Sequence, residues 1–198
     1  MRSLIRRLSF RTGRFVTLWH QTSHPCGEEW ASWLKIHGNL HRMGEHCSIQ
    51  TNVKITDPAY TAIGNNVRLS GCKIFGHDGS VNMINRALGL RLDSVGKVII
   101  GNNVTIGEGA VIYPGVTIHD NCIVLGGAHV TKDIPSGTVY GGVPAKQICT
   151  FEEFVACKVR KDSEYPWRAL TQARSAAFDS KLEPLLVKLR VAHFFPTP

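Results

Sequence analysis

The sequence predicts an all-β core in which very short strands coil around a single axis, with helical segments at both ends. Two observations predict it: apolar residues recur every six positions through the middle of the chain, and Gly, Asn, Asp and Pro fill the positions between them. Six is a multiple of the strand period of two and does not fit the helical period of 3.6, so the apolar positions share one side of extended segments. The 198 residues are 43% hydrophobic and 19% charged, which is typical of a globular protein.

Six consecutive hexads run without a break from Ile100 to Pro135. Their first positions are all Ile or Val, and their fifth positions are apolar and mostly small. The first positions are Ile100, Ile106, Ile112, Ile118, Val124 and Val130, and the fifth are Val104, Ala110, Val116, Cys122, Ala128 and Ile134. Because turn-forming residues separate the strands, the chain can change direction within each hexad, and each coil then buries its neighbour.

The same register continues upstream with Met43, Ile49 and Ile55 and, after a slip of two residues, with Ile63, Leu69 and Phe75 in the first positions. Lys73 falls on a fifth position and breaks the apolar rule. Residues 81–93 interrupt the count and are expected to form an extruded loop. The register predicts about five coils, over residues 43–60, 63–80, 94–111, 112–129 and 130–147.

Charge and composition divide the chain into a basic N-terminal helical lead (1–42), the repeat region (43–148) and a C-terminal helical extension (149–198). The lead carries seven Lys and Arg against two Glu. Its apolar residues recur at helical spacing among five arginines, a composition typical of a helix at a membrane surface. A helix packed across the end of the core, with its arginines in water, fits the same pattern. The apolar residues are Leu4, Leu8, Phe15, Leu18 and Trp19.

Three further local patterns predict structure in the two ends of the chain. A short helix over residues 28–37, with Trp30 and Trp33 on one face, is expected to cap the first coil. In the extension, Ser180 and Glu183 form a capping-box pattern ahead of leucines at helical spacing. The residues 165–167 predict a turn with an aromatic anchor.

Several protein classes are excluded by what the sequence lacks. No apolar run approaches the roughly 20 residues of a spanning helix, and no signal peptide is recognisable. The six cysteines form no C-x-x-C pair, so reduced thiols in a cytoplasmic protein are expected, at the inner membrane face if the basic lead binds lipid. The +8 charge fits an anionic partner, but no nucleic-acid-binding motif is present.

Residues 42–160 resemble the hexapeptide-repeat acyltransferases. The segments Gly76-His77-Asp78-Gly79-Ser80 and Gly141-Gly142-Val143-Pro144-Ala145-Lys146 are similar to the branch that O-acetylates sugars of bacterial surface polysaccharides. The resemblance implies a left-handed parallel β-helix of triangular section, with three hexads in each coil. It also implies a homotrimer with active sites between subunits, acetyl-CoA as the donor, and a saccharide as the acceptor.

The resemblance places the catalytic histidine at His77, at the mouth of the insertion. A histidine suits the reaction, because a sugar hydroxyl becomes a good nucleophile only when a base takes its proton during attack on the thioester. Asp78 or a backbone carbonyl would orient the ring. Asp57 lies near an acidic acceptor-binding position of the galactoside and maltose relatives.

The acetyl-CoA contacts implied by the resemblance fall on exposed positions of the later coils, and Lys132 and Lys146 are the candidates for its phosphates. Cys149 stands where relatives have a further basic residue, which weakens this cluster by one charge. The implied contacts are Glu108, Gly126, Gly127, Thr131, Lys132 and Lys146. In the extruded loop, Asn82, Asn85 and Arg86 could bind sugar hydroxyls or an acidic sugar.

Three alternative functions and one alternative mechanism stay beside this prediction. Transfer to the nitrogen of an amino sugar would need the same donor and less activation. A catalytically silent trimeric scaffold would bind no coenzyme. A zinc enzyme of the same fold would need three histidines at a spacing that His77, His119 and His129 do not have, so no metal is expected. Cys72 could form an acyl-enzyme, but a buried structural thiol is the simpler interpretation.

Overall fold

The computed structural model describes residues 2–176 and 178–196. The outer ends of the two predicted terminal segments, residues 1 and 197–198, lie outside the described residues, as does residue 177. The chain divides into two compact units, Met1–Phe151 and Glu152–Pro198. The first unit contains every described strand and the predicted catalytic histidine.

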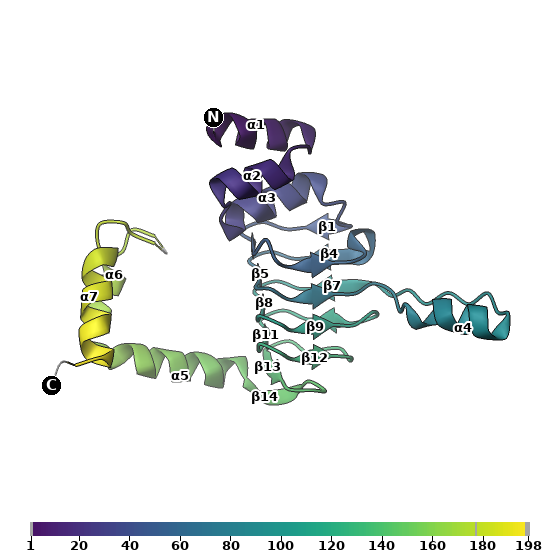
Figure 1. Ribbon diagram of the computed structural model, residues 1–198. Coiled ribbons are helices and arrows are strands. Elements are labelled where there is room, and N and C mark those ends of the chain that lie inside the picture. Colours follow the sequence, from purple (N-terminus) through teal and green to yellow (C-terminus); the bar gives the residue numbers. More distant parts are fainter. Residues whose placement is uncertain (1, 177, 197–198) are drawn as a thin grey trace. The chain divides into compact units, whose positions relative to one another are not determined.

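Short parallel strands stack into three faces (Figure 1). The first face holds β1 (Arg42–Met43), β4 (Thr61–Ile63), β7 (Val98–Ile100) and β10 (Thr117–Ile118). The second face holds β2 (Ser48–Ile49), β5 (Arg68–Leu69), β8 (Thr105–Ile106), β11 (Ile123–Val124), β13 (Thr138–Gly141) and β14 (Lys146–Thr150). The third face holds β3 (Lys54–Ile55), β6 (Lys73–Ile74), β9 (Val111–Ile112) and β12 (His129–Val130).

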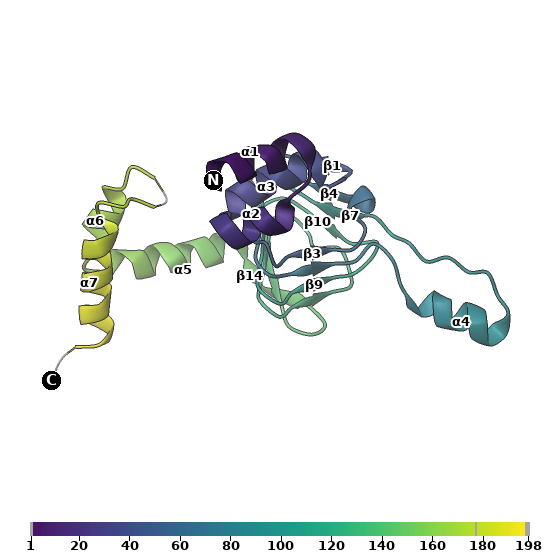
Figure 2. The ribbon, with the colours of Figure 1, turned by 45° about the horizontal axis from the view of Figure 1, so that its top comes forward.

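Successive strands pass from the first face to the second and then to the third, and the next coil begins again on the first. Seen from the N-terminal end, this path descends as a left-handed coil of triangular section (Figure 2). The predicted left-handed parallel β-helix is therefore confirmed. The fifth coil differs from the prediction, because β14 turns back and pairs antiparallel with β13 instead of crossing to the third face.

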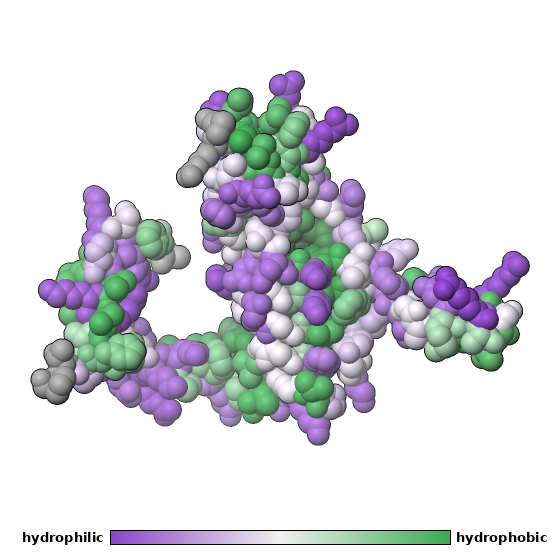
Figure 3. Space-filling model, in the orientation of Figure 1, coloured by the Kyte–Doolittle hydropathy of each residue, from purple (hydrophilic) through white to green (hydrophobic). Residues whose placement is uncertain are grey.

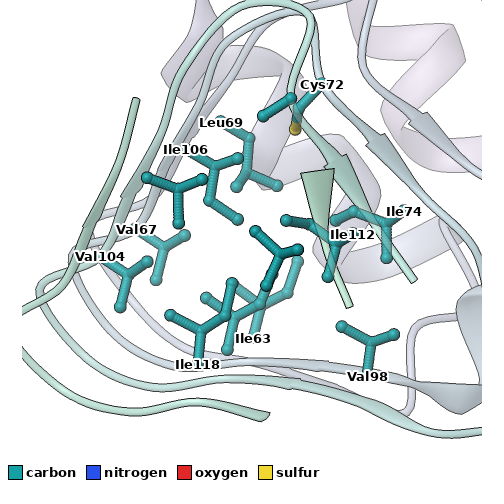
Figure 4. Packing of buried hydrophobic residues seen from close by; sticks show 14 of the residues in the cluster. Ile63, Val67, Leu69, Cys72, Ile74, Val98, Val104, Ile106, Ile112 and Ile118 are labelled. Atoms are coloured by element: carbon teal, nitrogen blue, oxygen red, sulfur yellow. The ribbon is translucent and has the colours of Figure 1, made fainter. Parts of the chain in front are cut away.

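The interior is filled by the residues that the six-residue register places inward. Ile106 and Ile112 are 0% exposed, and the core side chains of three faces point toward the centre of the triangle (Figure 4). Small residues such as Val104 and Ala110 occupy the fifth positions, next to the corners, where a larger side chain would not fit. The prediction of the core from the repeat is confirmed from Val98 onward.

The second coil departs from the predicted register by one residue. Cys72 and Ile74 are 0% exposed, whereas Lys73, expected inward, is exposed and Phe75 is only partly buried. The corner before β6 is shortened at Gly71, whose φ of +46° a side chain would rarely adopt. Burying Lys73 would strip its ammonium of water without a partner, so the chain shifts register and buries its apolar neighbours instead.

Asparagines line the corner between the first and second faces. Asn66, Asn103 and Asn121 take up left-handed φ values of 52°, 55° and 57°, which asparagine tolerates better than most residues. Their side chains form a ladder from coil to coil, with Asn66 Nδ2 donating to Asn103 Oδ1 and Asn103 Nδ2 to Asn121 Oδ1, both at 2.9 Å. Each coil is thus tied to the next at this corner.

Three N-terminal helices cover the first coil. They are α1 (Arg2–Thr12), α2 (Val16–Ser23) and α3 (Gly27–His37). The predicted second helix is confirmed as α3, since Ala31 is buried in the core and Trp30 packs against it. Trp33 Nε1 donates to the carbonyl oxygen of Ser9 at 3.2 Å, which fixes α1 on α3.

The insertion between β6 and β7 is not the simple loop that the sequence predicted, because it contains the helix α4 (Ser80–Leu88). Figure 1 shows α4 on an arm that projects from the stack, and none of its described residues is buried. One edge of α4 is apolar and the opposite edge is polar (Figure 3). The apolar residues of α4 recur at helical spacing, at Val81, Ile84 and Leu88. This local pattern favours a helix where the six-residue repeat is interrupted.

The second unit holds α6 (Arg168–Gln172), α7 (Glu183–Phe194) and all but the first residue of α5 (Phe151–Ser163), which begins where β14 ends. The predicted anchor is confirmed, since Trp167 is 5% exposed and stacks on Tyr165. The predicted capping box is wrong: Ser180 makes no cap, and the main-chain oxygen of Asp179 accepts the N–H of Glu183 instead.

Candidate active site

His77 lies at the corner between the third and first faces, where the arm leaves the β-helix. Its backbone forms an antiparallel bridge with Val95, where the arm returns. On either side, Asp78 N–H donates to the carbonyl oxygen of Ser94 at 2.9 Å, and Gly96 N–H to that of Gly76 at 2.8 Å. These contacts close the neck of the arm and hold the His77 backbone in place.

The imidazole of His77 is oriented by Asp57 from the preceding coil. The distance from Nδ1 to Asp57 Oδ2 is 2.7 Å. Because an ionised carboxylate can only accept, Nδ1 is the donor, and in the neutral ring Nε2 keeps its lone pair. The His77 side chain is 46% exposed, so this nitrogen is available to a substrate.

Asp57 is held in its ionised form by three donors. Thr56 Oγ1 donates to Asp57 Oδ2 at 2.6 Å, and the N–H of Gly76 donates to the same oxygen at 3.1 Å. The Thr56 hydrogen bond, followed by those from His77 and Gly76, holds the pKa of the Asp57 carboxyl below its ordinary value. A Cβ at Gly76 would lie 2.6 Å from that of Asp57, so only glycine allows this approach.

Asp78, the predicted orienting residue, is engaged elsewhere. Its Oδ1 accepts the N–H of Ser80 at 2.9 Å, at the start of α4, and this hydrogen bond lowers the pKa of the Asp78 carboxyl. The acid that contacts the His77 ring is therefore Asp57. The sequence contained a signal for it, since Asp57 lies close to an acidic position of the family, but the pairing with His77 was missed.

Two of the implied coenzyme contacts, Thr131 and Lys132, follow β12 at the same corner as His77. The register aligns Ile74 with Ile112 and Ile112 with Val130, so these two residues lie two coils beyond the histidine. At the ordinary spacing of adjacent strands this separation is about 10 Å. Both side chains are exposed.

Three other implied contacts lie at a different corner, between the second and third faces. Gly127 N–H donates to the main-chain oxygen of Glu108 at 2.8 Å, and Gly127 has open space around its Cα at a φ of +71°. Glu108 Oε1 accepts from Asn52 at 3.3 Å, and Gly126 is exposed beside it. Lys146 is exposed on β14, opposite Gly141. One chain thus presents the candidate residues at separate corners.

The predicted acceptor residues all lie on α4, with different surroundings. Asn85 has a structural role, because its side chain accepts the N–H of Leu92 at 2.7 Å and donates to the Leu92 oxygen at 2.9 Å, which closes the arm. Asn82 and Arg86 are exposed.

The thiol and the two other histidines considered in the sequence analysis lie in surroundings that do not suggest a catalytic role. Burial raises the pKa of the Cys72 thiol to about 12, so the thiolate that an acyl-enzyme needs is disfavoured. His129 lies with its Nδ1 3.4 Å from the hydroxyl of Tyr113, and His119 is exposed. Within residues 2–176 and 178–196, no three His, Cys, Asp or Glu side chains are grouped to hold a metal ion.

Comparisons with known proteins agree with this architecture. Residues 97–132 match the family model "Bacterial transferase hexapeptide (six repeats)". Protein CapG of Staphylococcus aureus is 38% identical over 128 residues, which are 63% of this chain and 73% of CapG. Galactoside O-acetyltransferase of Escherichia coli is 35% identical over 115 residues, 56% of this chain and 53% of that protein.

A solved structure of a hexapeptide-repeat acetyltransferase from Vibrio cholerae has the same fold, with a TM-score of 0.53 and 23% identity over 76% of this chain and 92% of its own. Together with the identity to CapG, these matches define the class. The chain belongs to the hexapeptide-repeat acyltransferase family.

Proposed function

We propose that this protein transfers the acetyl group of acetyl-CoA to a sugar hydroxyl, with His77 as the general base. The observation that carries the proposal is the Asp57–His77 pair, in which the neutral ring donates from Nδ1 and keeps the Nε2 lone pair, on a side chain that is 46% exposed. Membership of an acyltransferase family and the likeness to a galactoside O-acetyltransferase support it. The acceptor we favour is a bacterial surface polysaccharide or its lipid-linked or nucleotide-linked precursor.

The reaction needs two proton transfers, one to His77 and one from it. His77 Nε2 takes the proton of the acceptor hydroxyl while its oxygen bonds to the thioester carbon. The tetrahedral intermediate then collapses, the C–S bond breaks, and the proton passes from His77 to the leaving sulfur. Asp57 stabilises the transient imidazolium and keeps the ring in the productive orientation, as a carboxylate does in other histidine bases.

Binding of the donor is assigned to the exposed residues of the later coils. Lys132 and Lys146 carry charges suited to phosphates, and the open backbone at Gly127 suits the amide-bearing arm. Thr131 would place its hydroxyl at the His77 corner.

The experiment that tests the function measures free CoA thiol released from acetyl-CoA with a panel of neutral, acidic and amino sugars. Acceptor-dependent release with hydroxyl sugars is the expected result. Release only with amino sugars would identify an N-acetyltransferase instead. A protein that neither binds acetyl-CoA nor releases thiol with any acceptor would be a scaffold.

We also propose that the active protein is a homotrimer. The candidate residues of one chain lie at two corners of the triangle, so a site that uses all of them is completed most simply by two neighbouring chains. Light scattering of the purified full-length protein is expected to give three times the mass of one chain. A monomer with full activity would contradict the proposal.

Contact with an anionic membrane surface is proposed for the N-terminal helices. Arg6 pairs with Glu29 at 2.8 Å, but Arg7, Arg11 and Arg14 are exposed beside apolar side chains. Leu4 and Phe15 are 67% and 52% exposed. None of the helices in the described part of the chain is long and apolar enough to span a membrane. Such a surface would place the enzyme at the cytoplasmic face.

This contact predicts sedimentation of the protein with phosphatidylglycerol vesicles and little with pure phosphatidylcholine. Replacing Leu4 and Leu8 by Ser is expected to lower the partition coefficient at least about tenfold, because two exposed leucines leave the apolar layer. Val159→Ser, at an exposed apolar position in α5, is the control. Equal loss in both variants, or no preference for the anionic lipid, would contradict the proposal.

A further inference from the structure

A cavity of about 420 Å³ opens on the first face, where its strands begin. Ala62 of β4 and Ile99 of β7 form an apolar floor, and Tyr60, which is 48% exposed, stands at the side. None of the residues assigned above to acetyl-CoA or to the sugar lines this cavity. An apolar floor with an accessible aromatic ring is a surface suited to the face of a sugar ring.

The rim of the cavity is positively charged. Arg42 and Lys97 line it together with His41, and none of the described lining residues carries a carboxylate. Across the part of the chain that the structure describes, neither Arg42 nor Lys97 takes part in an ion pair. Two unpaired cations around an apolar floor favour a ligand that carries negative charge.

The cavity and the His77 base lie on two sides of one corner. Tyr60 N–H donates to the main-chain oxygen of Asp57 at 3.1 Å, which ties the cavity wall to the acid that orients the histidine. On the other side, Lys97 directly follows Gly96, and Val95 pairs with His77 itself. The two segments that hold His77 in place, one at Asp57 and one at Val95, therefore both continue into the wall of the cavity.

From this arrangement we infer that the cavity is the acceptor subsite and that it selects sugars bearing an anionic group, a carboxylate or a phosphate. The inference rests on the proposed acetyl transfer and specifies its substrate class. The sugar ring lies on the floor beside Tyr60, Arg42 and Lys97 bind the anionic group, and the hydroxyl reaches round the corner toward His77. A neutral sugar fills the same floor and leaves both cations in water.

The test compares methyl β-glucuronide with methyl β-glucoside, which differ only at C6, a carboxylate in the first and a hydroxymethyl group in the second, and adds UDP-glucose as a phosphate-bearing neutral sugar. Two readouts are taken with the full-length protein: the Michaelis constant for thiol release, and saturation-transfer NMR of each sugar without acetyl-CoA. Lys97→Gln and Arg42→Gln remove one charge each. Arg68→Gln is the control, since Arg68 is also an exposed arginine but lies on the second face.

The wild type is expected to prefer at least one anionic sugar over the glucoside about tenfold, and Lys97→Gln to remove most of that preference, in proportion to a lost charge-assisted hydrogen bond at a partly exposed site. Loss confined to the glucuronide identifies a carboxylate ligand, and loss confined to UDP-glucose a phosphate ligand. The preference also falls as salt is raised. Arg68→Gln leaves both constants unchanged.

Two results distinguish a failure of the proposed subsite from a failure of the proposed acetyl transfer. Equal transfer to the glucoside and to both anionic probes, unaffected by Lys97→Gln and Arg42→Gln, overturns the subsite and leaves the acetyltransferase standing. Anionic sugars that bind through Lys97 without any thiol release overturn the acetyl transfer and leave the anion site standing. Lack of binding by every probe, with unchanged kinetics in both variants, also overturns the subsite.

Discussion

His77→Ala is expected to lower kcat/KM for acetyl transfer by roughly 10²- to 10⁴-fold, the range over which a positioned base contributes. The side chain is 46% exposed and its backbone is held by the neck of the arm, so the fold does not depend on it. Thiol release measured at saturating acetyl-CoA gives the loss, and circular dichroism gives the fold.

Three companions make this prediction specific. His119→Ala removes another exposed histidine and should retain full activity. Asp57→Asn keeps the shape of the side chain but removes its charge, and we expect a fall of about 10- to 100-fold through the disturbed orientation of the ring. Asp78→Asn should cost little, since that carboxylate contacts Ser80 and not the ring. Full activity of His77→Ala, or a larger loss in Asp78→Asn than in Asp57→Asn, would refute the assignment.

Ile74→Ala is expected to lower the free energy of unfolding by about 2 to 5 kcal/mol. Its side chain is 0% exposed and lies between Ile55 and Ile112 of the adjacent coils, so a cavity would remain in a closely packed triangle. The loss is measured by equilibrium unfolding in urea, at a protein concentration held constant across variants because the proposed assembly would add to stability.

The neighbouring Lys73→Ala is the matched control. The six-residue count puts Lys73 inward, whereas the structure exposes it and buries Ile74 and Cys72 instead. The structure therefore predicts a change within about 0.5 kcal/mol for Lys73→Ala. A larger loss for Lys73→Ala than for Ile74→Ala would restore the register read from the sequence.

The architecture was predictable because the repeat is long, and an error at one hexad leaves the others in phase. Local features were harder to predict, since each depends on an energetic balance that the six-residue repeat does not reveal. The shift at Lys73 follows from the cost of burying an amine, and α4 follows from helical spacing inside a segment that the count treats as a gap.

The candidate site was predictable in part. The continuous motif around His77 singles it out in the sequence. Asp57, which contacts its ring, lies twenty residues earlier and meets it only when two coils are stacked. The slip between those coils hid the alignment. The roles of Asn85 and Asp78 in fixing the arm could not be predicted from the sequence either, because both depend on the helix α4, which had not been predicted.

The ends of the strand stack determine how long the β-helix can become. A parallel stack leaves unpaired backbone groups on its outermost strands, and a strand of another molecule could continue it. At the first coil α3 occupies that place, with Ala31 in the core, and at the last coil β14 runs against β13. A further parallel coil would meet a strand of the wrong direction on the second face. Both ends thus oppose growth into filaments, and the β-helix keeps a finite length.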